Sequence, residues 1–314
     1  MIPSSRISLL PSKDGTMWIL GFKEEVYRVD LSKNRWTTYD NLNFEFRTPD
    51  GKEWYLSADG RVVVNDLNNW YAYGPESGLM KAPVRLYLSS QGVVWAAGSH
   101  ESTSATAFLN GDEWHMEVHP HLSWGIDHRS VFESSDGSLW FGASVDLQAE
   151  KGHKAGVLRL LNPGQLLHQW KHYRTLEDGI TQYNVYGIGE STDGNIWIGG
   201  SRLHRFDGES WSDEHEIEQL NEFVDIVYTS PSKKLWVGSR FYGLFCFDGQ
   251  DWQHFTINEG LSSNTIINVF EESDSSVWVI TNQGICWYDG ESWFPDVFSS
   301  HIPIPREGGS IAVS

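Results

Sequence analysis

One stretch of the chain gathers four histidines: His115, His119, His121 and His128. Imidazole nitrogens are common metal ligands, and His119 and His121 would project on the same side of an extended segment. The acids Glu117 and Asp127 are the other ligands within reach, and no cysteine lies nearby. Histidines in such a polar stretch are more often solvated, so we predict no metal site and no cofactor.

A second polar stretch is rich in acids: Asp213, Glu214, Glu216, Glu218 and Glu222. Paired carboxylates are what glycoside hydrolysis requires, but one of them needs an apolar pocket that raises its pKa, and this stretch predicts none. The chain also lacks a Ser-His-Asp motif, a phosphate loop and a nucleophile elbow. We therefore predict no catalytic residues. A lyase or glycoside hydrolase using His119, His121 or Glu216 is kept as the alternative.

A third group consists of the consecutive residues Arg240, Phe241 and Tyr242. A guanidinium beside aromatic faces suits carboxylated or hydroxylated ligands. This segment is the strongest candidate for ligand binding in the sequence.

Composition excludes several partners. The 314 residues carry 23 Lys and Arg against 42 Asp and Glu, a net charge of −19. Such a chain repels nucleic acid and anionic membrane surfaces. It has neither an apolar run long enough for membrane insertion nor a signal-peptide core at Met1 to Leu10. Its two cysteines, Cys246 and Cys286, are predicted to be buried thiols rather than a disulfide.

The elements that must position these residues are revealed by the tryptophans. Fourteen of the 16 fall into two interleaved series. The first is Trp18, Trp54, Trp95, Trp140, Trp197, Trp236 and Trp278, and the second is Trp36, Trp70, Trp114, Trp170, Trp211, Trp252 and Trp293. Successive members of the first series are about 43 residues apart, and a turn signal such as Asp136-Gly137 or Asp193-Gly194 precedes most of them. Asp-Gly predicts a type I′ hairpin turn.

Two hairpins per repeat make a four-stranded sheet with two apolar faces, which seven copies can bury by radial stacking. We therefore predict an all-β fold, a single seven-bladed β-propeller of four-stranded antiparallel blades spanning 1–314. The expected blades cover approximately 5–40, 41–74, 83–118, 129–174, 184–213, 223–256 and 266–298. Residues 299–314 would close the ring or begin a further repeat. The paired tryptophans are expected to be core, whereas Trp124 lies outside both series.

In such a propeller the Asp-Gly turns lie on one face, and the second-to-third-strand loops and blade linkers lie on the other. We call this second face the loop face and expect the ligand there. The candidate ligand-binding residues are Lys23, His100, Trp124, Arg202, Arg240, Phe241, Tyr242, Asn282 and Gln283. A polar insertion in the fourth blade, residues 145–155, is an additional candidate to line the site.

Linker motifs carry a family resemblance. Ser77-Gly78-Leu79, Asp178-Gly179-Ile180 and Glu259-Gly260-Leu261 each run on through a strand and a turn to a first-series tryptophan. This pattern resembles the two-component regulator propeller repeat over essentially the whole chain. The resemblance implies a ligand-sensing domain of a bacterial hybrid histidine kinase, a class often found outside the cytoplasm and responsive to polysaccharide fragments.

We therefore predict a noncatalytic binding or sensory propeller for signal transduction. Its expected partners are an oligosaccharide, a peptide or another small ligand, or a signalling protein; a protein-interaction scaffold is the other alternative. The compartment stays open: cytoplasmic if Met1 is the native start, and periplasmic or extracellular if the chain is an excised sensor domain.

Overall fold

The computed structural model describes the strand residues 8–11, 16–20, 25–30 and 35–40, together with residues 42–66, 69–144, 154–165, 167–214, 216–272 and 276–295. Side chains are described from residue 42 onward, except those of 69 and 70. The predicted site residue Lys23, most of the insertion at 145–155 and the segment 299–314 lie outside these ranges.

The described residues form seven four-stranded antiparallel sheets, each built from four consecutive strands. The first three sheets contain β1–β4 (Ser8–Pro11, Thr16–Leu20, Glu25–Asp30, Arg35–Asp40), β5–β8 (Leu42–Arg47, Glu53–Ser57, Val62–Asp66, Asn69–Tyr73) and β9–β12 (Ala82–Leu88, Val94–His100, Thr103–Asn110, Glu113–Val118). The next two contain β13–β16 (Gly125–Glu133, Leu139–Ser144, Val157–Leu160, Trp170–Tyr173) and β17–β20 (Gly187–Glu190, Ile196–Gly199, His204–Phe206, Trp211–Asp213). The last two contain β21–β24 (Val224–Thr229, Leu235–Ser239, Leu244–Phe247, Trp252–Phe255) and β25–β28 (Ile266–Glu271, Val277–Thr281, Ile285–Tyr288, Trp293–Phe294). Short 3₁₀ helices, η1 (Pro75–Ser77) and η2 (Glu218–Asn221), lie in two linkers.

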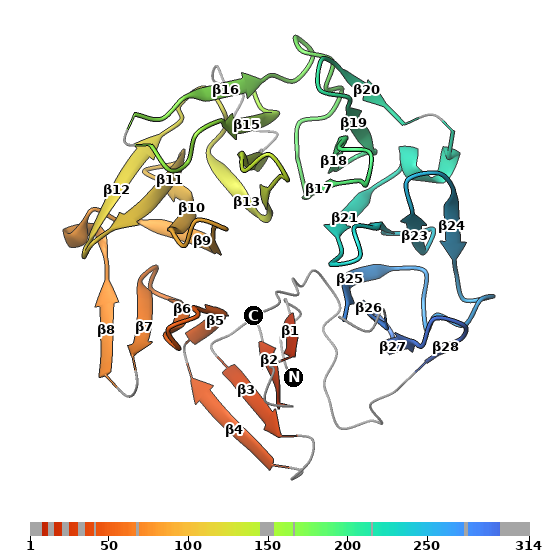
Figure 1. Ribbon diagram of the computed structural model, residues 1–314, viewed down its shortest axis with the longest axis horizontal. Coiled ribbons are helices and arrows are strands. Elements are labelled where there is room, and N and C mark those ends of the chain that lie inside the picture. Colours follow the sequence, from red (N-terminus) through yellow and green to blue (C-terminus); the bar gives the residue numbers. More distant parts are fainter. Residues whose placement is uncertain are drawn as a thin grey trace.

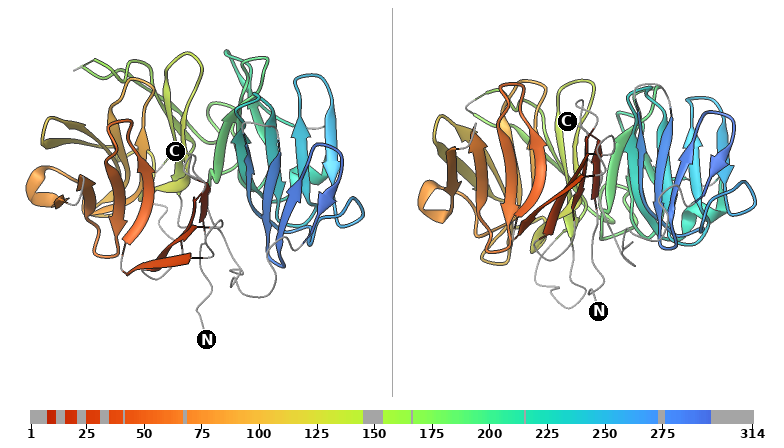
Figure 2. Two further views of the ribbon diagram at one scale, coloured as in Figure 1. Left: turned by 60° about the horizontal axis from the view of Figure 1, so that its bottom comes forward. Right: turned by 90° about the horizontal axis from the view of Figure 1, so that it is seen from below.

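The sheets stand side by side around a central axis, with the first strand of each nearest the centre (Figures 1 and 2). This is a β-propeller, so the predicted all-β fold is confirmed. Because strands alternate in direction, the first and third turns of every blade lie on one face and the second turns and the linkers on the other.

The Asp-Gly turns differ in type from the prediction. In the turn after β13, Gly137 N–H donates to Ser134 O at 2.8 Å and Ser134 N–H to Ser138 O at 3.0 Å. Gly137 has a φ of +79°, and Asp136 is not among the residues with positive φ. A type I turn followed by a left-handed glycine therefore closes a three-residue loop. The type I′ prediction was wrong because the loop contains one residue more, Ser135.

The core lies between blades rather than at the centre of the ring. Five hydrophobic clusters are described, and each joins two neighbouring sheets from the β5–β8 blade to the β25–β28 blade. Trp95, Trp140 and Trp197 are each only 1% exposed. Every tryptophan of the two series with a described side chain is buried or half-buried. Their assignment to the core is confirmed.

The glycine of the linker motif has a specific role. Gly78, Gly179 and Gly260 have φ values of +86°, +92° and +113°. A Cβ on Gly78 would lie 2.0 Å from the carbonyl oxygen of Trp114, which belongs to the outer strand of the next blade. The following residues, Leu79 among them, are buried. The motif thus lets the linker pass close beneath the outer tryptophan and anchors it there.

Polar contacts connect successive blades near the channel. Glu190, at the end of β17, accepts hydrogen bonds from Ser135 N–H at 2.7 Å and from Ser135 Oγ–H at 2.6 Å. Glu133, at the end of β13, binds Ser90 in the same way. Thr229, at the end of β21, donates its hydroxyl to the Glu190 carbonyl at 2.9 Å. The inner strands β13, β17 and β21 are therefore each fastened to the first turn or to the inner strand of the blade before them.

Both cysteines are free and buried, as predicted. Both cysteines pack in the hydrophobic cluster between the last two described sheets.

Truncating one interblade tryptophan should weaken the fold strongly. Trp197→Ala removes a buried ring whose Nε1–H donates to Ser191 Oγ at 2.7 Å. We expect the free energy of unfolding to fall by about 3–5 kcal/mol in urea denaturation. Trp124→Ala is the matched control, because that ring is 37% exposed and its loss should cost clearly less than the loss of Trp197. Equal losses in the two variants would contradict the interblade core.

Candidate functional site

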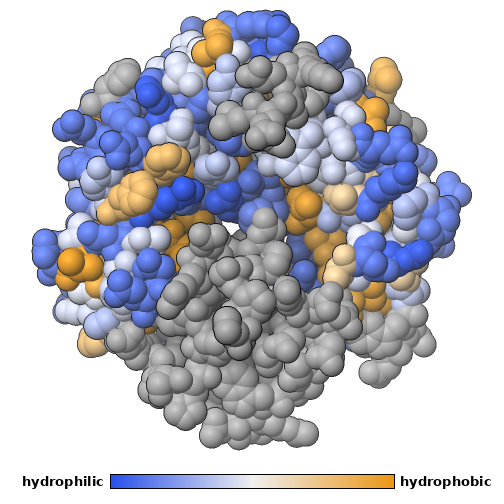
Figure 3. All heavy atoms as spheres, turned by 180° about the vertical axis from the view of Figure 1, so that it is seen from behind, coloured by the Kyte–Doolittle hydropathy of each residue, from blue (hydrophilic) through white to orange (hydrophobic). Residues whose placement is uncertain are grey.

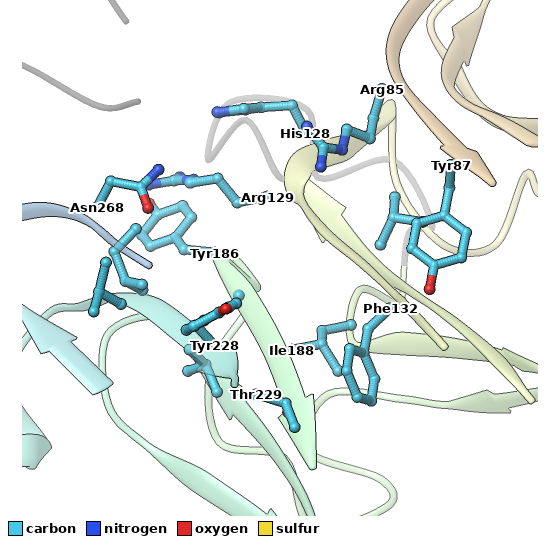
Figure 4. Close-up of a pocket in the computed structure, with 15 residues that line it drawn as sticks. Arg85, Tyr87, His128, Arg129, Phe132, Tyr186, Ile188, Tyr228, Thr229 and Asn268 are labelled. Carbon is cyan, nitrogen blue, oxygen red and sulfur yellow. The ribbon is translucent and has the colours of Figure 1, made fainter. Parts of the chain in front are cut away.

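The central channel contains a cavity of about 280 Å³. Its walls come from the five inner strands β9, β13, β17, β21 and β25 and from Tyr186, which directly precedes β17. Figure 4 shows Arg85, His128, Arg129 and Asn268 grouped at one end, with Phe132, Ile188 and Thr229 toward the other. Each inner strand begins at the loop face and ends at an Asp-Gly turn. Along these strands Arg85, His128, Arg129 and Asn268 come before the apolar residues of the other end. The polar end of the cavity therefore faces the loop face.

Irregular strand pairing brings the polar side chains to this end. The ladders between the first and second strands shift register between Ile126 and Val131 in β13, between Val224 and Ile226 in β21, and between Ile266 and Asn268 in β25. A bulge leaves residues without a ladder partner and redirects their side chains. Arg129 and Asp225 lie inside two of these bulges.

An ionic network occupies the polar end. Arg129 donates from Nε and Nη2 to the two carboxylate oxygens of Asp127 at 3.0 and 3.1 Å. Its guanidinium carbon lies 4.2 Å from the ring centroid of Tyr186, in the next blade. One blade further, Asp225 Oδ1 lies 3.9 Å from Arg129 Nη1. Asp225 in turn accepts two hydrogen bonds from Arg240, each of 2.8 Å.

The network fixes its own charge states. Burial acts to raise the pKa of Asp127, but the adjacent Arg129 guanidinium and its hydrogen bonds outweigh this effect and lower that pKa. Burial acts in the opposite sense on Arg129, and the Asp127 charge again prevails, so the pKa of Arg129 is raised. Both groups are ionised at neutral pH, and a carboxyl with a lowered pKa is a poor proton donor.

Arg85 approaches the cavity from β9 with a looser partner. Its Nη1 lies 3.7 Å from Glu45 Oε2, which is beyond hydrogen-bond length. That same oxygen accepts the Leu86 backbone N–H at 2.9 Å. Glu45 therefore holds β9 in place and serves Arg85 as a counter-charge at a distance.

The other end of the cavity is mainly apolar. Val131, Phe132, Ile188, Val227 and Val269 line it, together with the aromatic bodies of Tyr87 and Tyr228. Burial raises the pKa of both tyrosines, so their hydroxyls stay protonated. The cavity thus combines cationic donors with an apolar wall.

The strongest predicted cluster lies beside this network. Arg240 reaches Asp225, its guanidinium carbon lies 4.8 Å above the Phe223 ring, and Phe241 packs edge-on against the same ring. Tyr242 donates its hydroxyl to Glu222 at 3.1 Å. Arg240 is 41% exposed and does not line the cavity itself. Asp225 lies between Arg240 and the cavity-lining Arg129 and contacts both.

The remaining predicted residues are spread over separate blades. Arg202 donates to Asp213 Oδ2 at 2.8 Å on its own blade, away from the cavity. His100 ends β10, Trp124 precedes β13, and Asn282 and Gln283 form the turn after β26. None of these residues lines the cavity. Their role in binding stays a prediction.

The histidine stretch is divided between two places. His128 lines the channel cavity, with its Nδ1 3.3 Å from Asp127. His119 instead accepts or donates a 2.9 Å hydrogen bond with Thr106 and packs against Trp170 of the following blade, with 4.6 Å between ring centroids. His121 and Glu216 are exposed and do not line the cavity.

The channel residues Arg85, Arg129, Tyr186 and Asn268 were not predicted from the sequence. A signal was present: Asp127, His128 and Arg129 interrupt the otherwise apolar start of an inner strand. Charged residues inside a strand that two blades should bury indicate either an ion pair or a site.

Within the described ranges, no group of three or more His, Cys, Asp or Glu side chains is arranged to hold a metal ion. A search of the same ranges finds no helix with the length and hydrophobicity needed to cross a membrane. On the face opposite to that of Figure 1, hydrophilic residues gather near the centre and hydrophobic ones flank them (Figure 3).

The sequence matches neither a family model nor a curated protein. Among solved structures, PorZ, a bacterial surface component of the type-IX secretion system of Porphyromonas gingivalis, matches with a TM-score of 0.67 and 14% identity. That match covers 90% of this chain and 46% of PorZ, so this chain spans about half the length of PorZ. Virginiamycin B lyase from Staphylococcus aureus matches with a TM-score of 0.63 and 14% identity over 88% of this chain and 91% of the lyase. These similarities show the fold.

The extracellular domain of the hybrid two-component system protein BT3049 of B. thetaiotaomicron is a further match, with a TM-score of 0.46 and 16% identity. It covers 96% of this chain and 53% of that domain.

Acid should destabilise the protein through His119. Burial lowers the pKa of His119 to about 4, whereas an unfolded histidine titrates near pH 6.5. Between these values the unfolded chain binds a proton that folded His119 does not, so stability decreases as the pH falls from about 6.5 toward 4. Urea denaturation across this range should show a shallower decrease for His119→Asn. The exposed His121→Asn serves as control, and a wild-type slope in His119→Asn would contradict the prediction.

Proposed function

We propose that this chain is a noncatalytic ligand-binding propeller of the sensory kind, and that it holds its ligand at the loop-face end of the central channel. The observation that carries the proposal is the cavity in which one basic side chain, Arg129, is fixed by an ionic network across three blades. Side chains fixed before binding lose little conformational freedom when a ligand arrives.

The charge states of the network favour binding over catalysis. Hydrolysis of a glycosidic bond needs a carboxylic acid with a raised pKa. Asp127, the carboxyl nearest to Arg129, has a lowered pKa, and Asp225 accepts a two-pronged hydrogen bond from Arg240. Both carboxylates act as counter-ions that orient guanidinium groups.

Aromatic residues extend the site across the loop face. Trp124 is 37%, Phe223 41% and Phe241 50% exposed, and all three lie in linkers or in a second-to-third-strand loop. Such rings stack on sugars and on peptide side chains. A ligand that begins in the cavity and continues over these rings would be an oligosaccharide or a peptide.

A thermal-shift screen tests the function. The purified chain is heated with oligosaccharides, peptides and divalent metals, because a ligand that binds the native state raises the melting temperature. Each hit is then incubated with the protein and analysed by mass spectrometry. A hit that stays intact supports the binding module. A hit that is cleaved overturns it in favour of a lyase or hydrolase.

Arg240 should matter for binding but little for stability. Arg240 is 41% exposed, and its partner Asp225, which is 14% exposed, has Arg129 as a second cation 3.9 Å away, so Arg240→Ala should leave the melting temperature nearly unchanged. In this variant Asp225 keeps Arg129 as its cationic neighbour but loses Arg240, so the Asp225 carboxylate offsets more of the positive charge of Arg129. An acidic hit should therefore bind several-fold more weakly in calorimetry. Arg205→Ala, an exposed arginine on β19, is the control. If Arg240→Ala unfolds the protein, its assignment to the loop-face site is wrong.

A further inference from the structure

The charged side chains that line the cavity are all basic. Of the described lining residues, Arg85 and Arg129 are cationic, His128 can become so, and no carboxylate lines the wall. This is unusual in a chain with a net charge of −19. The carboxylates lie behind the arginines: Asp127 on β13, Asp225 on β21 and Glu45 on β5. Such a wall presents donors to an anion, and the acids behind it keep the donors in position.

Arg85 is the donor best placed to accept a new partner. Asp127 already takes two hydrogen bonds from Arg129. Arg85, by contrast, has its Glu45 contact at 3.7 Å, and a guanidinium carries five N–H donors in a planar fork that matches a carboxylate. A carboxylate at the polar end of the cavity would bind Arg85 directly, with Arg129 and His128 beside it.

The opposite end of the cavity selects the rest of the ligand. Phe132, Ile188 and Val227 present hydrocarbon there, and Ile188 is 4% exposed. An apolar group placed against them leaves water, whereas a sugar ring would lose hydrogen bonds. The volume of about 280 Å³ is nearly twice that of a cavity of about 150 Å³ that binds benzene. The space therefore suits a ligand portion of roughly 10–13 non-hydrogen atoms.

From these observations we infer that the cavity binds an apolar carboxylate: a carboxylate on Arg85, flanked by Arg129 and His128, attached to an aryl or branched aliphatic group that lies against Phe132, Ile188 and Val227. The inference rests on the proposed function and specifies its ligand. The same chemistry occurs in a free small acid and in the C-terminal residue of a peptide. In the second case the preceding residues would leave toward the exposed rings of Phe223 and Phe241 on the loop face.

Calorimetry with matched acids and amides tests the inference on the full chain. The probes are 3-phenylpropanoate and its neutral amide 3-phenylpropanamide, together with the peptide acetyl-Gly-Gly-Phe as free acid and as C-terminal amide. Each acid should bind at least tenfold more tightly than its amide. A preference for 3-phenylpropanoate over the peptide acid identifies a free small acid as the source, and the reverse preference identifies a peptide C-terminus. Equal affinity of both acids and their amides overturns the inference.

Variants locate the carboxylate. Arg85→Gln should weaken the binding of 3-phenylpropanoate at least tenfold, while Arg205→Gln, on the exposed side of β19, should leave it unchanged. Wild-type affinity in a folded Arg85→Gln variant overturns the assignment. If Arg85→Gln does not fold, the comparison of acid with amide on the wild-type chain decides the matter.

The two proposals fail in different ways. If the acids do not bind but a neutral saccharide from the screen does, the ligand class inferred here is wrong and the binding function stands. If intact 3-phenylpropanoate binds and Arg85→Gln abolishes its binding, both are supported. Cleavage of the peptide acid during the titration overturns the proposed function and leaves the carboxylate contact supported.

Discussion

The two apolar faces of every blade are the constraint on which the rest of the structure depends. A four-stranded sheet of this composition cannot be stable alone, because each face must be covered by a neighbour. The five described clusters show how this is done: Trp95, Trp140 and Trp197 are each inserted between two sheets. A ring is the arrangement in which every sheet has two neighbours. The channel, and hence the cavity, follows from closing that ring.

The cavity also contains largely buried arginines, whose charges are balanced by acids close to them. Buried charges need partners: Arg129 has Asp127 on its own strand, and Arg85 has Glu45 on the adjacent blade. The half-exposed Arg240 has Asp225 on its own blade. The net charge of the chain gives no hint of this arrangement, since the acidic excess lies elsewhere. What the cavity offers a ligand is decided by the direction of a few side chains and not by the total charge.

Features that repeat regularly along the chain could be predicted from the sequence, and irregular ones could not. The tryptophan spacing and the Asp-Gly signals repeat in nearly every blade, so they predict sheets, turns and core, although the one extra residue Ser135 changes the turn type. The site is irregular. Arg240 was predicted because it stands beside Phe241 and Tyr242, but its partner Asp225 lies inside a bulge that no single sequence displays. His119 was placed among candidate catalytic residues because its burial against Trp170 depends on the neighbouring blade.

The bulges have a second consequence, for the edges of the sheets. The innermost strand of each blade is an edge strand, and a straight edge with unpaired N–H and C=O groups invites pairing with another chain. A bulge twists such an edge out of line, and a charged side chain on it opposes association. Arg129 and Asp225, on the bulged edges of β13 and β21, therefore also guard the open centre of the ring against aggregation.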